Sequence, residues 1–240
     1  MKEYKADLHI HTCLSPCAGL EMSPGNIVGE AKRKGLQVIG ICDHNSAENV
    51  PAVSKTAARE GITVIGGMEV TSKEEVHILA LLGSEESLFA LQEIVHESLQ
   101  GTNDEKLYGE QVIVNEDEEV MGFSDKLLIG ATGMTLERLV GLIHERDGLA
   151  IAAHVDREAF GIIGQLGFIP EGLRLDALEL ADPSKRDCVP QGVRLPFITS
   201  SDAHRLEDVG RRTTTFLMPA ANSAGIRQCL SEAGGKRIRV

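Results

Sequence analysis

YKADLHI (4–10), LQVIGIC (36–42) and ITVIGGMEV (62–70) are three short runs rich in aliphatic and β-branched residues. The segments between them, 23–35 and 49–61, have the apolar spacing and flanking Pro and Gly residues that are typical of helices. Alternation of this kind predicts repeated β–α units and a parallel sheet. The beginning of the chain therefore favours an α/β fold.

The pattern continues to EVHILALLG (75–83) and then changes. Helical patterns at 89–100 and 135–148 enclose a polar, acidic stretch, so we predict a mainly helical insertion over 85–147. Strand-like runs return afterwards at 149–156, 175–182, 195–204 and 213–219, followed by a helix near 223–235 and a short strand at 237–240. The length of 240 residues fits one barrel or sheet domain with an insertion, and we expect a single domain over 1–240.

Composition and charge narrow the class of partner. The chain has 36 acidic and 24 basic residues, a net charge of −12, and this excess opposes sequence-independent contacts with the phosphates of long nucleic acids. No apolar run is long enough to span a bilayer and the first residues lack the apolar stretch of a signal peptide. We therefore expect a soluble cytoplasmic protein that acts on a small substrate, away from membranes. The oligomeric state is left open.

Polar residues follow the predicted strands at the points where these strands end. In DLHIHT (7–12), His9 and His11 are two residues apart, so on a regular strand they share a face with Asp7, while Leu8 and Ile10 take the other face. The same kind of residue recurs along the chain at His44, Glu69, His77, His154, Asp202 and His204. Carboxyl ends of parallel strands meet at one edge of an α/β fold, so these side chains are expected to converge.

Each motif alone also fits a structural role. An HxH pair can lie on a surface, His77 in EVHILAL fits a buried core histidine, and Asp43 can cap a helix or orient His44. Together, converging imidazoles and carboxylates must be hydrogen-bonded, neutralised or bound to metal, and the mixed N and O donors suit Zn²⁺, Mn²⁺ or Fe²⁺. His96 and His144 fall on predicted helices and are interpreted as surface or packing residues.

With DLHIHT, CDHN, GMEV, EVHIL, AAHVDR and SSDAH in this order, the sequence resembles the PHP family, named for polymerase and histidinol phosphatase. The resemblance implies a distorted (β/α)7 TIM-like barrel that holds two or three divalent metal ions at its mouth and hydrolyses phosphate esters. It implies one metal at His9, His11, Glu69 and Asp202, a second at Glu69, His77 and His154, and a third at His44 and His204.

Two positions depend on details of the resemblance. Six residues after His11, where the family usually has His or Asp, this chain has Cys17, which either completes the third metal site or is a plain thiol. The insertion after His77 resembles that of the small-molecule phosphoesterase branch, in which a helical subdomain covers the barrel mouth. In that branch Arg157 would contact the substrate phosphate; the alternative is a surface ion pair.

The resulting hypothesis is hydrolysis of a small phosphorylated metabolite or nucleotide by metal-activated hydroxide. Asp202 would take part as a ligand, Arg157 would bind phosphoryl oxygens, and His204 or His44 would protonate the leaving group. Alternatives that stay open are a metal-dependent hydrolase of another bond, a nuclease acting on short oligonucleotides, and a non-catalytic regulatory module that senses metal or redox state through Cys13 and Cys17.

Overall fold

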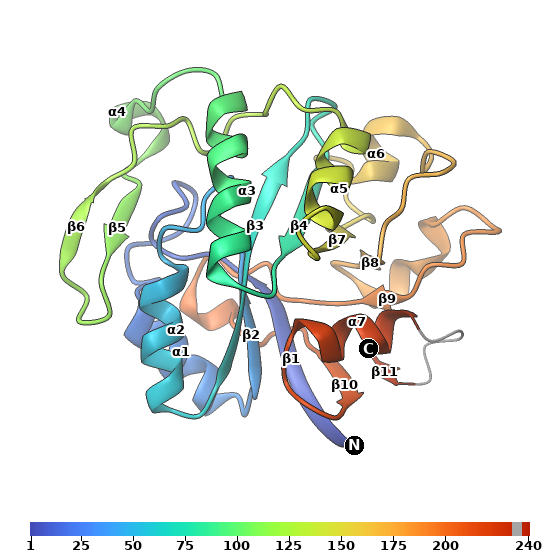
Figure 1. The fold of residues 1–240 in the computed structure, drawn as a ribbon, viewed down its shortest axis with the longest axis horizontal. Helices are drawn as coiled ribbons and strands as arrows, with labels where there is room; N and C mark the ends of the chain where they lie inside the picture. Colours follow the sequence, from blue (N-terminus) through green and yellow to red (C-terminus); the bar gives the residue numbers. More distant parts are fainter. Residues whose placement is uncertain (232–236) are drawn as a thin grey trace.

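The computed structural model describes residues 1–231 and 237–240 of the chain. Within them, one sheet of nine strands curls into a nearly closed barrel, in the strand order β11-β10-β1-β2-β3-β4-β7-β8-β9 (Figure 1). The strands are β1 (Lys2–Ile10), β2 (Val38–Ile41), β3 (Thr63–Thr71), β4 (His77–Leu81), β7 (Leu149–Ala152), β8 (Ala177–Glu179), β9 (Phe197–Ile198), β10 (Thr214–Met218) and β11 (Ile238–Arg239). The predicted α/β barrel is confirmed.

The strands run in both directions. β1, β2 and β3 are parallel, as are β7, β8 and β9, but β4 is antiparallel to both β3 and β7. β10 is antiparallel to β1, and β11 to β10. The prediction of a wholly parallel sheet is therefore wrong for these strands. β3 and β4 are joined by only a few residues, which is too short for a parallel crossover.

The barrel closes between β1 and the segment that follows β9. The backbone N–H of Ala203 donates to the carbonyl oxygen of His9 over 3.2 Å, and the N–H of His11 donates to the carbonyl oxygen of Ala203 over 3.0 Å. The other half of β1, from Lys2 to Ala6, pairs with β10. β10 and the segment around Ala203 thus share one edge of β1, and the carboxyl end of β1 is fixed beside Asp202.

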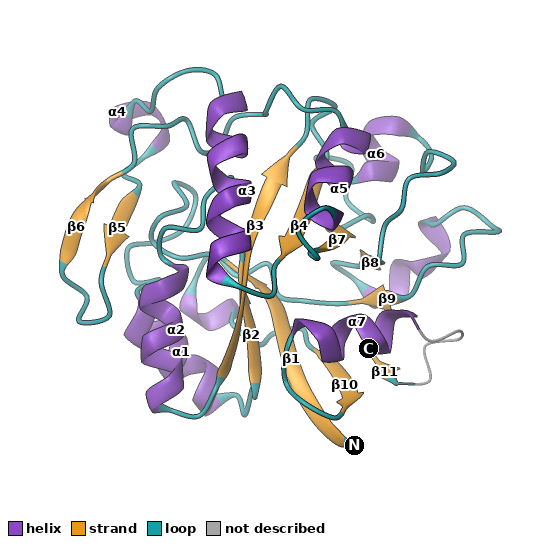
Figure 2. Cartoon of the chain, in the orientation of Figure 1, coloured by secondary structure: helices purple, strands orange, loops and turns teal. Residues whose placement is uncertain are grey.

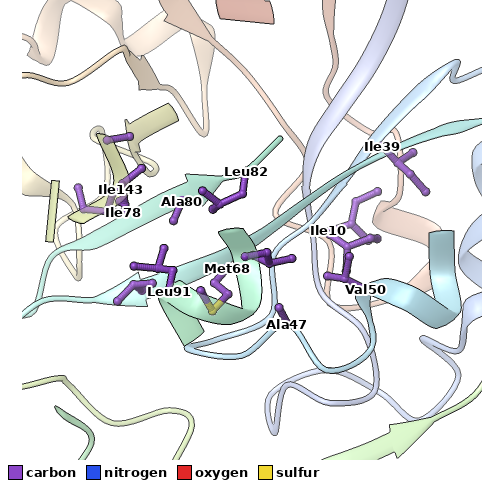
Figure 3. Packing of buried hydrophobic residues seen from close by; sticks show 14 of the residues in the cluster. Ile10, Ile39, Ala47, Val50, Met68, Ile78, Ala80, Leu82, Leu91 and Ile143 are labelled. Carbon is purple, nitrogen blue, oxygen red and sulfur yellow. The ribbon is translucent and has the colours of Figure 1, made fainter. Parts of the chain in front are cut away.

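Helices cover the outer face of the sheet (Figure 2). Their apolar faces pack with outward-facing strand residues in an outer cluster, which includes Ile39, Met68, Leu91 and Ile143 (Figure 3). The helices of the outer cluster are α1 (Pro24–Arg33), α2 (Val50–Arg59), α3 (Glu85–Ser98), α5 (Leu136–His144) and α6 (Ile162–Leu166). The other helices are α4 (Glu105–Tyr108) and α7 (Ser223–Ser231), with 3-10 turns η1 (Pro183–Cys188) and η2 (Leu206–Asp208). For α7, positions 232–235 of the predicted helix lie outside the described residues.

A second, inner cluster fills the barrel. Leu79, Ile151 and Ile198 belong to it, and α7 packs against it through Ile226. Strand residues alternate between the two clusters, as expected for side chains that point to opposite faces of a sheet. Aliphatic side chains dominate both clusters, in keeping with 3% aromatic residues in the chain.

β1 departs from this alternation. Leu8 packs in the inner cluster, whereas Ile10 packs in the outer cluster. The pairing register of β1 and β2 shifts between Asp7 and Ile10, which resets the faces of the strand. The prediction that Leu8 and Ile10 share a face is therefore wrong. Asp7 also does not join His9 and His11, because its carboxylate accepts hydrogen bonds from Ser201 and the N–H of Gly210.

The mainly helical insertion over 85–147 is not confirmed. α3 and α5 pack on the sheet as outer helices of the barrel. Between them lie the single turn α4 and a separate hairpin of β5 (Val112–Val114) and β6 (Val120–Phe123), which lies next to α1 and α2 in Figure 1. The hairpin is tied to α2 by the ion pair of Lys55 and Glu116 at 3.1 Å. Its strands are too short for hydrophobic periodicity to reveal.

No helix among the described residues is both long and apolar enough to cross a bilayer. That residues 1–240 form a single domain stays a prediction.

A substitution at Gly40 tests how closely β1 and β2 pack. A Cβ atom at this position would lie 2.3 Å from the carbonyl oxygen of Leu8, a backbone atom that cannot move aside. We expect Gly40→Ala to lower the free energy of unfolding by about 2 kcal/mol or more, as overpacking does. Urea unfolding measures the change.

Gly29 supplies the matched control. It lies on the exposed side of α1 with no neighbouring atom within 4 Å, so Gly29→Ala should stabilise the protein by up to about 1 kcal/mol. Equal effects of the two substitutions would contradict the close packing at Gly40.

Candidate metal centre

Histidines and carboxylates from several strands meet at one end of the barrel. All are buried except Asp202 and His204, which are half-buried. They come from β1 and its loop, from the loop after β2, from β3 and β4, and from the loops after β7 and β9: His9 and His11, His44, Glu69, His77, His154, and Asp202 with His204. The structure therefore brings together all the histidines and carboxylates that the sequence predicts as ligands.

Glu69 is the centre of this cluster. Its Oε1 atom lies 2.7 Å from Nδ1 of His77, 3.1 Å from Nε2 of His154 and 3.4 Å from Nε2 of His9. Its Oε2 atom lies 3.1 Å from Nδ1 of His44 and 3.4 Å from Nε2 of His11. One buried carboxylate thus faces five imidazole rings, and each of its oxygens has more than one nitrogen neighbour.

Asp202 is the second carboxylate of the cluster. Its Oδ1 atom lies 3.3 Å from Nε2 of His9 and 3.2 Å from Nε2 of His11. Its Oδ2 atom accepts a hydrogen bond of 2.5 Å from the guanidinium of Arg157, whose side chain is 44% exposed. Arg157 therefore makes the ion pair that the sequence left as an alternative, but with a residue of the cluster.

The donor atoms form three overlapping groups, each with its atoms within 4.8 Å of one another. The groups are His9, His11, Glu69 and Asp202; His44, Glu69 and His77; and His11, His44 and His204. The first is the set predicted for one metal. His154 lies beside the second group through its contact with Glu69, and His11 joins the third.

Unsatisfied atoms show that these residues fit a cation. Nδ1 of His44 and Oδ1 of Asp202 are buried and have no hydrogen-bond partner, although several donor atoms lie within 3.7 Å of them. Buried polar atoms are seldom left without a partner. Two such atoms in a group of imidazole and carboxylate donors fit a cation, and this donor set suits Zn²⁺, Mn²⁺ or Fe²⁺.

The two carboxylates of the cluster need positive charge close by. Burial opposes ionisation of Glu69, but His77, His9 and His44 hold its pKa well below the usual range. Burial likewise lowers the pKa of His11, but Asp202 and Glu69 raise it to about 9. Both carboxylates thus stay ionised in a buried place, which requires either protons on the imidazoles or bound cations.

Neighbouring side chains orient the donor atoms. Oε2 of Glu179, on β8, lies 3.0 Å from Nδ1 of His9 and also accepts from the N–H of His154. Nδ1 of His11 lies 2.9 Å from Oγ of Ser15. Such contacts fix the ring and leave the opposite nitrogen for a metal. Sequence reasoning missed Glu179, although a carboxylate inside the apolar run LDALELAD was a usable signal.

The sequence left open that Asp43 orients His44, and the structure shows that it does not. Its carboxylate accepts from the N–H and hydroxyl of Thr12 and from the hydroxyl of Ser15. It therefore supports His11 through Ser15. The backbone from Asp43 to Asn45 pairs with Glu69 as a short extended bridge, and in extended backbone successive side chains point to opposite sides.

The backbone is strained at three residues of the site. His154, Asp202 and Phe160 have φ angles of 29°, 52° and 60°, in the left-handed region that residues with a Cβ atom seldom adopt. Strain of this kind persists only where surrounding contacts enforce it, and it is common at functional sites.

His77 is placed differently from the prediction. It opens β4, so it lies at the amino end of this strand. Because β4 is antiparallel to β3, its amino end meets the carboxyl ends of the other strands. His96 and His144 belong to none of the three groups, and His144 lies 2.9 Å from Asp176.

A cavity of about 290 Å³ opens onto the cluster. Its lining includes Cys17, Arg157, Ile129 and Phe160 together with residues of the cluster. Cys17 belongs to none of the three donor groups. Cys13 is buried, and burial raises the pKa of its thiol to about 12, so the structure gives no support to a redox module that uses Cys13 and Cys17.

Known proteins share this sequence pattern and fold. The family model described as PHP domain matches residues 7–169, and the model described as PHP-associated matches residues 191–233. The chain is 35% identical over 78 residues to uncharacterized protein MJ1587 of Methanocaldococcus jannaschii, covering 29% of this chain and 46% of the relative. It is 31% identical over 80 residues to a 5′-3′ exoribonuclease of Haemophilus influenzae, covering 32% of this chain and 28% of the relative. The chain spans less than half the length of these relatives.

Two solved structures have this fold along nearly the whole chain. The lesion-specific endonuclease PfuEndoQ of Pyrococcus furiosus matches with a TM-score of 0.73 and 22% identity, over 99% of this chain and 58% of the endonuclease. A complex of endonuclease Q with a 27-mer duplex that carries an abasic lesion at the active site matches with a TM-score of 0.71 and 20% identity, over 98% and 58%.

The prediction of a small phosphorylated substrate and no long nucleic acid is corrected by these structures. It rested on the net charge of −12. Endonuclease Q, whose fold covers almost all of this chain, holds a DNA duplex with a lesion at its active site. Net charge acts on contacts along the whole surface, whereas the charges of a site dominate the field where the substrate reacts.

Metal binding gives a direct test of the cluster. We expect the wild type to bind Mn²⁺ or Zn²⁺ and to gain about 2.7 kcal/mol of stability for each independent site at a free metal concentration 100 times its dissociation constant. Glu69→Gln keeps the shape of the side chain but removes the charge that the cluster shares. It should lose at least one equivalent of metal in elemental analysis and most of the thermal shift.

Glu60 provides the matched control, because it is an exposed glutamate at the end of α2 that pairs with Lys32 and belongs to none of the donor groups. Glu60→Gln should bind metal as the wild type does. An unchanged metal content in Glu69→Gln would contradict the assignment.

Proposed function

Because the chain belongs to the PHP domain family of metal-dependent hydrolases, we propose that it hydrolyses phosphodiester bonds of nucleic acid. The predicted family and enzyme class are confirmed. The observation that carries the proposal is the Glu69 carboxylate facing five imidazoles at the base of a cavity that Arg157 also lines. The exoribonuclease relative and the endonuclease Q fold support nucleic acid as the substrate class.

In the proposal, the three donor groups hold divalent cations. His9, His11, Glu69 and Asp202 hold one, Glu69 with His77, His154 and His44 a second, and His44 with His204 and His11 a third. When bound, such cations supply an activated water nucleophile and neutralise charge on the phosphoryl oxygens. Zn²⁺, Mn²⁺ and Fe²⁺ all suit these ligands, and the number of ions is part of the proposal.

Arg157 binds the phosphate of the substrate in this proposal. Its guanidinium already donates to Oδ2 of Asp202, and its side chain is 44% exposed in the lining of the cavity. The remaining N–H groups can donate to two phosphoryl oxygens in the planar geometry that suits a guanidinium. The ion pair with Asp202 then holds the guanidinium of Arg157 beside the donor group that contains Asp202.

His204 takes the role of a ligand more readily than that of an acid. Its Nδ1 atom lies 2.9 Å from the carbonyl oxygen of Asp202, and a carbonyl can only accept, so Nδ1 carries the proton. Nε2 therefore presents a lone pair. We assign His204 to the third cation on this ground.

Cleavage of a labelled single-stranded oligonucleotide tests the function. With Mn²⁺ or Zn²⁺ the wild type should cleave it, EDTA should stop the reaction, and His9→Ala with Asp202→Ala should remove metal and activity together. Arg157→Ala should keep its metal and lower kcat/KM by about 10- to 150-fold, the usual effect of losing a charged hydrogen bond.

Arg205 is a suitable control for Arg157, because it is exposed and does not line the cavity. Arg205→Ala should retain wild-type kcat/KM. No cleavage of any oligonucleotide by metal-loaded wild type would refute the proposed substrate.

Cys17 is proposed as an additional ligand of the third cation. The thiol is exposed and lines the cavity with His44 and His204. A cation that binds the thiolate must displace its proton. We expect Cys17→Ser to weaken Zn²⁺ binding more than Mn²⁺ binding, because thiolate favours softer metals. Competition titrations measure the ratio.

Cys188 is a free, exposed thiol outside the cavity lining and serves as the control. If Cys17→Ser keeps the metal stoichiometry and the Zn²⁺ preference of Cys188→Ser, then Cys17 is not a ligand.

A further inference from the structure

An apolar rim lies beside the polar floor of the cavity. Phe160 and Ile129 both line the cavity, and each remains 39% exposed. They come from different loops, one after β7 and one between β6 and α5. Phe123 and Phe168 are exposed as well, but Phe160 is the phenylalanine that lines the cavity.

Phe160 is held in a fixed orientation. Its ring stacks on the ring of His77 with centroids 4.4 Å apart and 15° between the planes. Its carbonyl oxygen accepts from the N–H of His77 over 2.9 Å, and the next residues are the closely packed Gly161 and the fully buried Ile162. Its φ of 60° is enforced by these contacts. Stacking covers one face of the ring and leaves the other open to a ligand.

Ile129 is held as firmly. The side-chain amide of Asn45, the residue after His44, donates to the carbonyl oxygens of Leu128 at 2.7 Å and Gly130 at 2.9 Å. These carbonyls flank Ile129, so both sides of its backbone are fixed. Leu128 is fully buried, whereas Ile129 is exposed to the cavity. An exposed apolar residue on a rigid loop at a site is more consistent with ligand contact than with packing.

From this geometry we propose that Phe160 and Ile129 form a subsite for the nucleobase next to the scissile phosphate. This inference rests on the proposed function and names the form of its substrate. Every nucleobase has a flat π face, and an aromatic side chain stacks on it whatever the sequence. The cavity of about 290 Å³ matches the low end of about 300 Å³ for pockets that bind small organic ligands, so it takes one nucleotide unit.

A base in this subsite must be unpaired. Inside a duplex both faces of a base are covered by its neighbours, and the ring of Phe160 reaches a face only at a strand end, in a single strand or on an extruded nucleotide. Arg157 lies three residues before Phe160 on the same loop, so phosphate and base would be held by one segment. The enzyme would therefore cut beside unpaired nucleotides that retain their base.

Two oligonucleotides test the subsite. Both are single strands of six nucleotides with one cleavable phosphodiester, and they differ only in whether the flanking nucleotide carries thymine or is abasic. The metal-loaded wild type should prefer the thymine strand by about tenfold in kcat/KM, as expected for stacking on one aromatic side chain. Phe160→Ala should reduce this preference to less than about twofold, and Phe160→Trp should retain it.

A binding measurement gives a readout apart from turnover. With 2-aminopurine in place of thymine, the fluorescence of the base should be quenched on binding to wild type and to Phe160→Trp, but not to Phe160→Ala. Phe168→Ala is the matched control, because Phe168 is 56% exposed and outside the cavity lining. It should behave as the wild type in both measurements.

The outcomes separate the subsite from the proposed function. If Phe160→Ala keeps the preference, or if both strands lose rate equally together with bound metal, Phe160 acts only through His77 and the subsite is refuted while nucleic-acid cleavage stands. If the wild type shows no preference yet cleaves both strands, the subsite is again refuted. If the metal-loaded wild type cleaves neither strand, the proposed function fails and the subsite fails with it.

Discussion

The buried carboxylate of Glu69 is the constraint on which the rest of the structure depends. An ionised carboxylate with 1% exposure costs several kcal/mol in lost hydration unless positive charge surrounds it. Here five imidazoles from different strands and loops approach it within 3.4 Å. Four separate segments must carry these rings to the same point, so the sheet has to curl until the segments converge. Closure of the barrel between His9, His11 and Ala203 serves this convergence, since it places Asp202 beside His9 and His11.

Irregular features of the fold occur where this convergence requires them. The register shift in β1 turns His9 and His11 inward, although Leu8 also points inward. The reversed direction of β4 brings His77 to the site from the amino end of its strand. The left-handed backbone at His154 and Asp202 aims side chains that a regular loop would direct elsewhere. A regular barrel would be less strained but would not assemble the cluster, which is the usual exchange of stability for a functional geometry.

Many residues of the site were predictable from their type and their position at strand ends. The residues that orient these ligands were not predictable. The alternating runs predict the barrel, and every predicted histidine and carboxylate ligand enters the cluster because polar residues next to apolar strands have few other reasons to be buried. Which face of the sheet each side chain of β1 takes could not be predicted. A bulge shifts the alternation of side chains, and no residue pattern in the sequence indicates it. The roles of Ser15 and Asp43 depend on contacts between residues 28 positions apart in the sequence, and that of Glu179 depends on barrel closure, which brings β8 near β1. The insertion was misjudged because three-residue and four-residue strands carry too little periodicity to distinguish from loops.

The acidic composition and a polyanionic substrate are compatible because they act over different distances. A net charge of −12 opposes contacts spread along a duplex, and salt screens such contacts beyond roughly 8–10 Å. Inside the cavity the positive charges are those of Arg157 and of the cations that the donor groups would hold, and these attract a single phosphate. Net charge therefore does not decide the length of the nucleic acid that the proposed enzyme takes, and contacts within one or two nucleotides contribute affinity whatever that length is. A stacking surface at Phe160, next to the phosphate-binding Arg157 of the proposal, supplies affinity of that local kind.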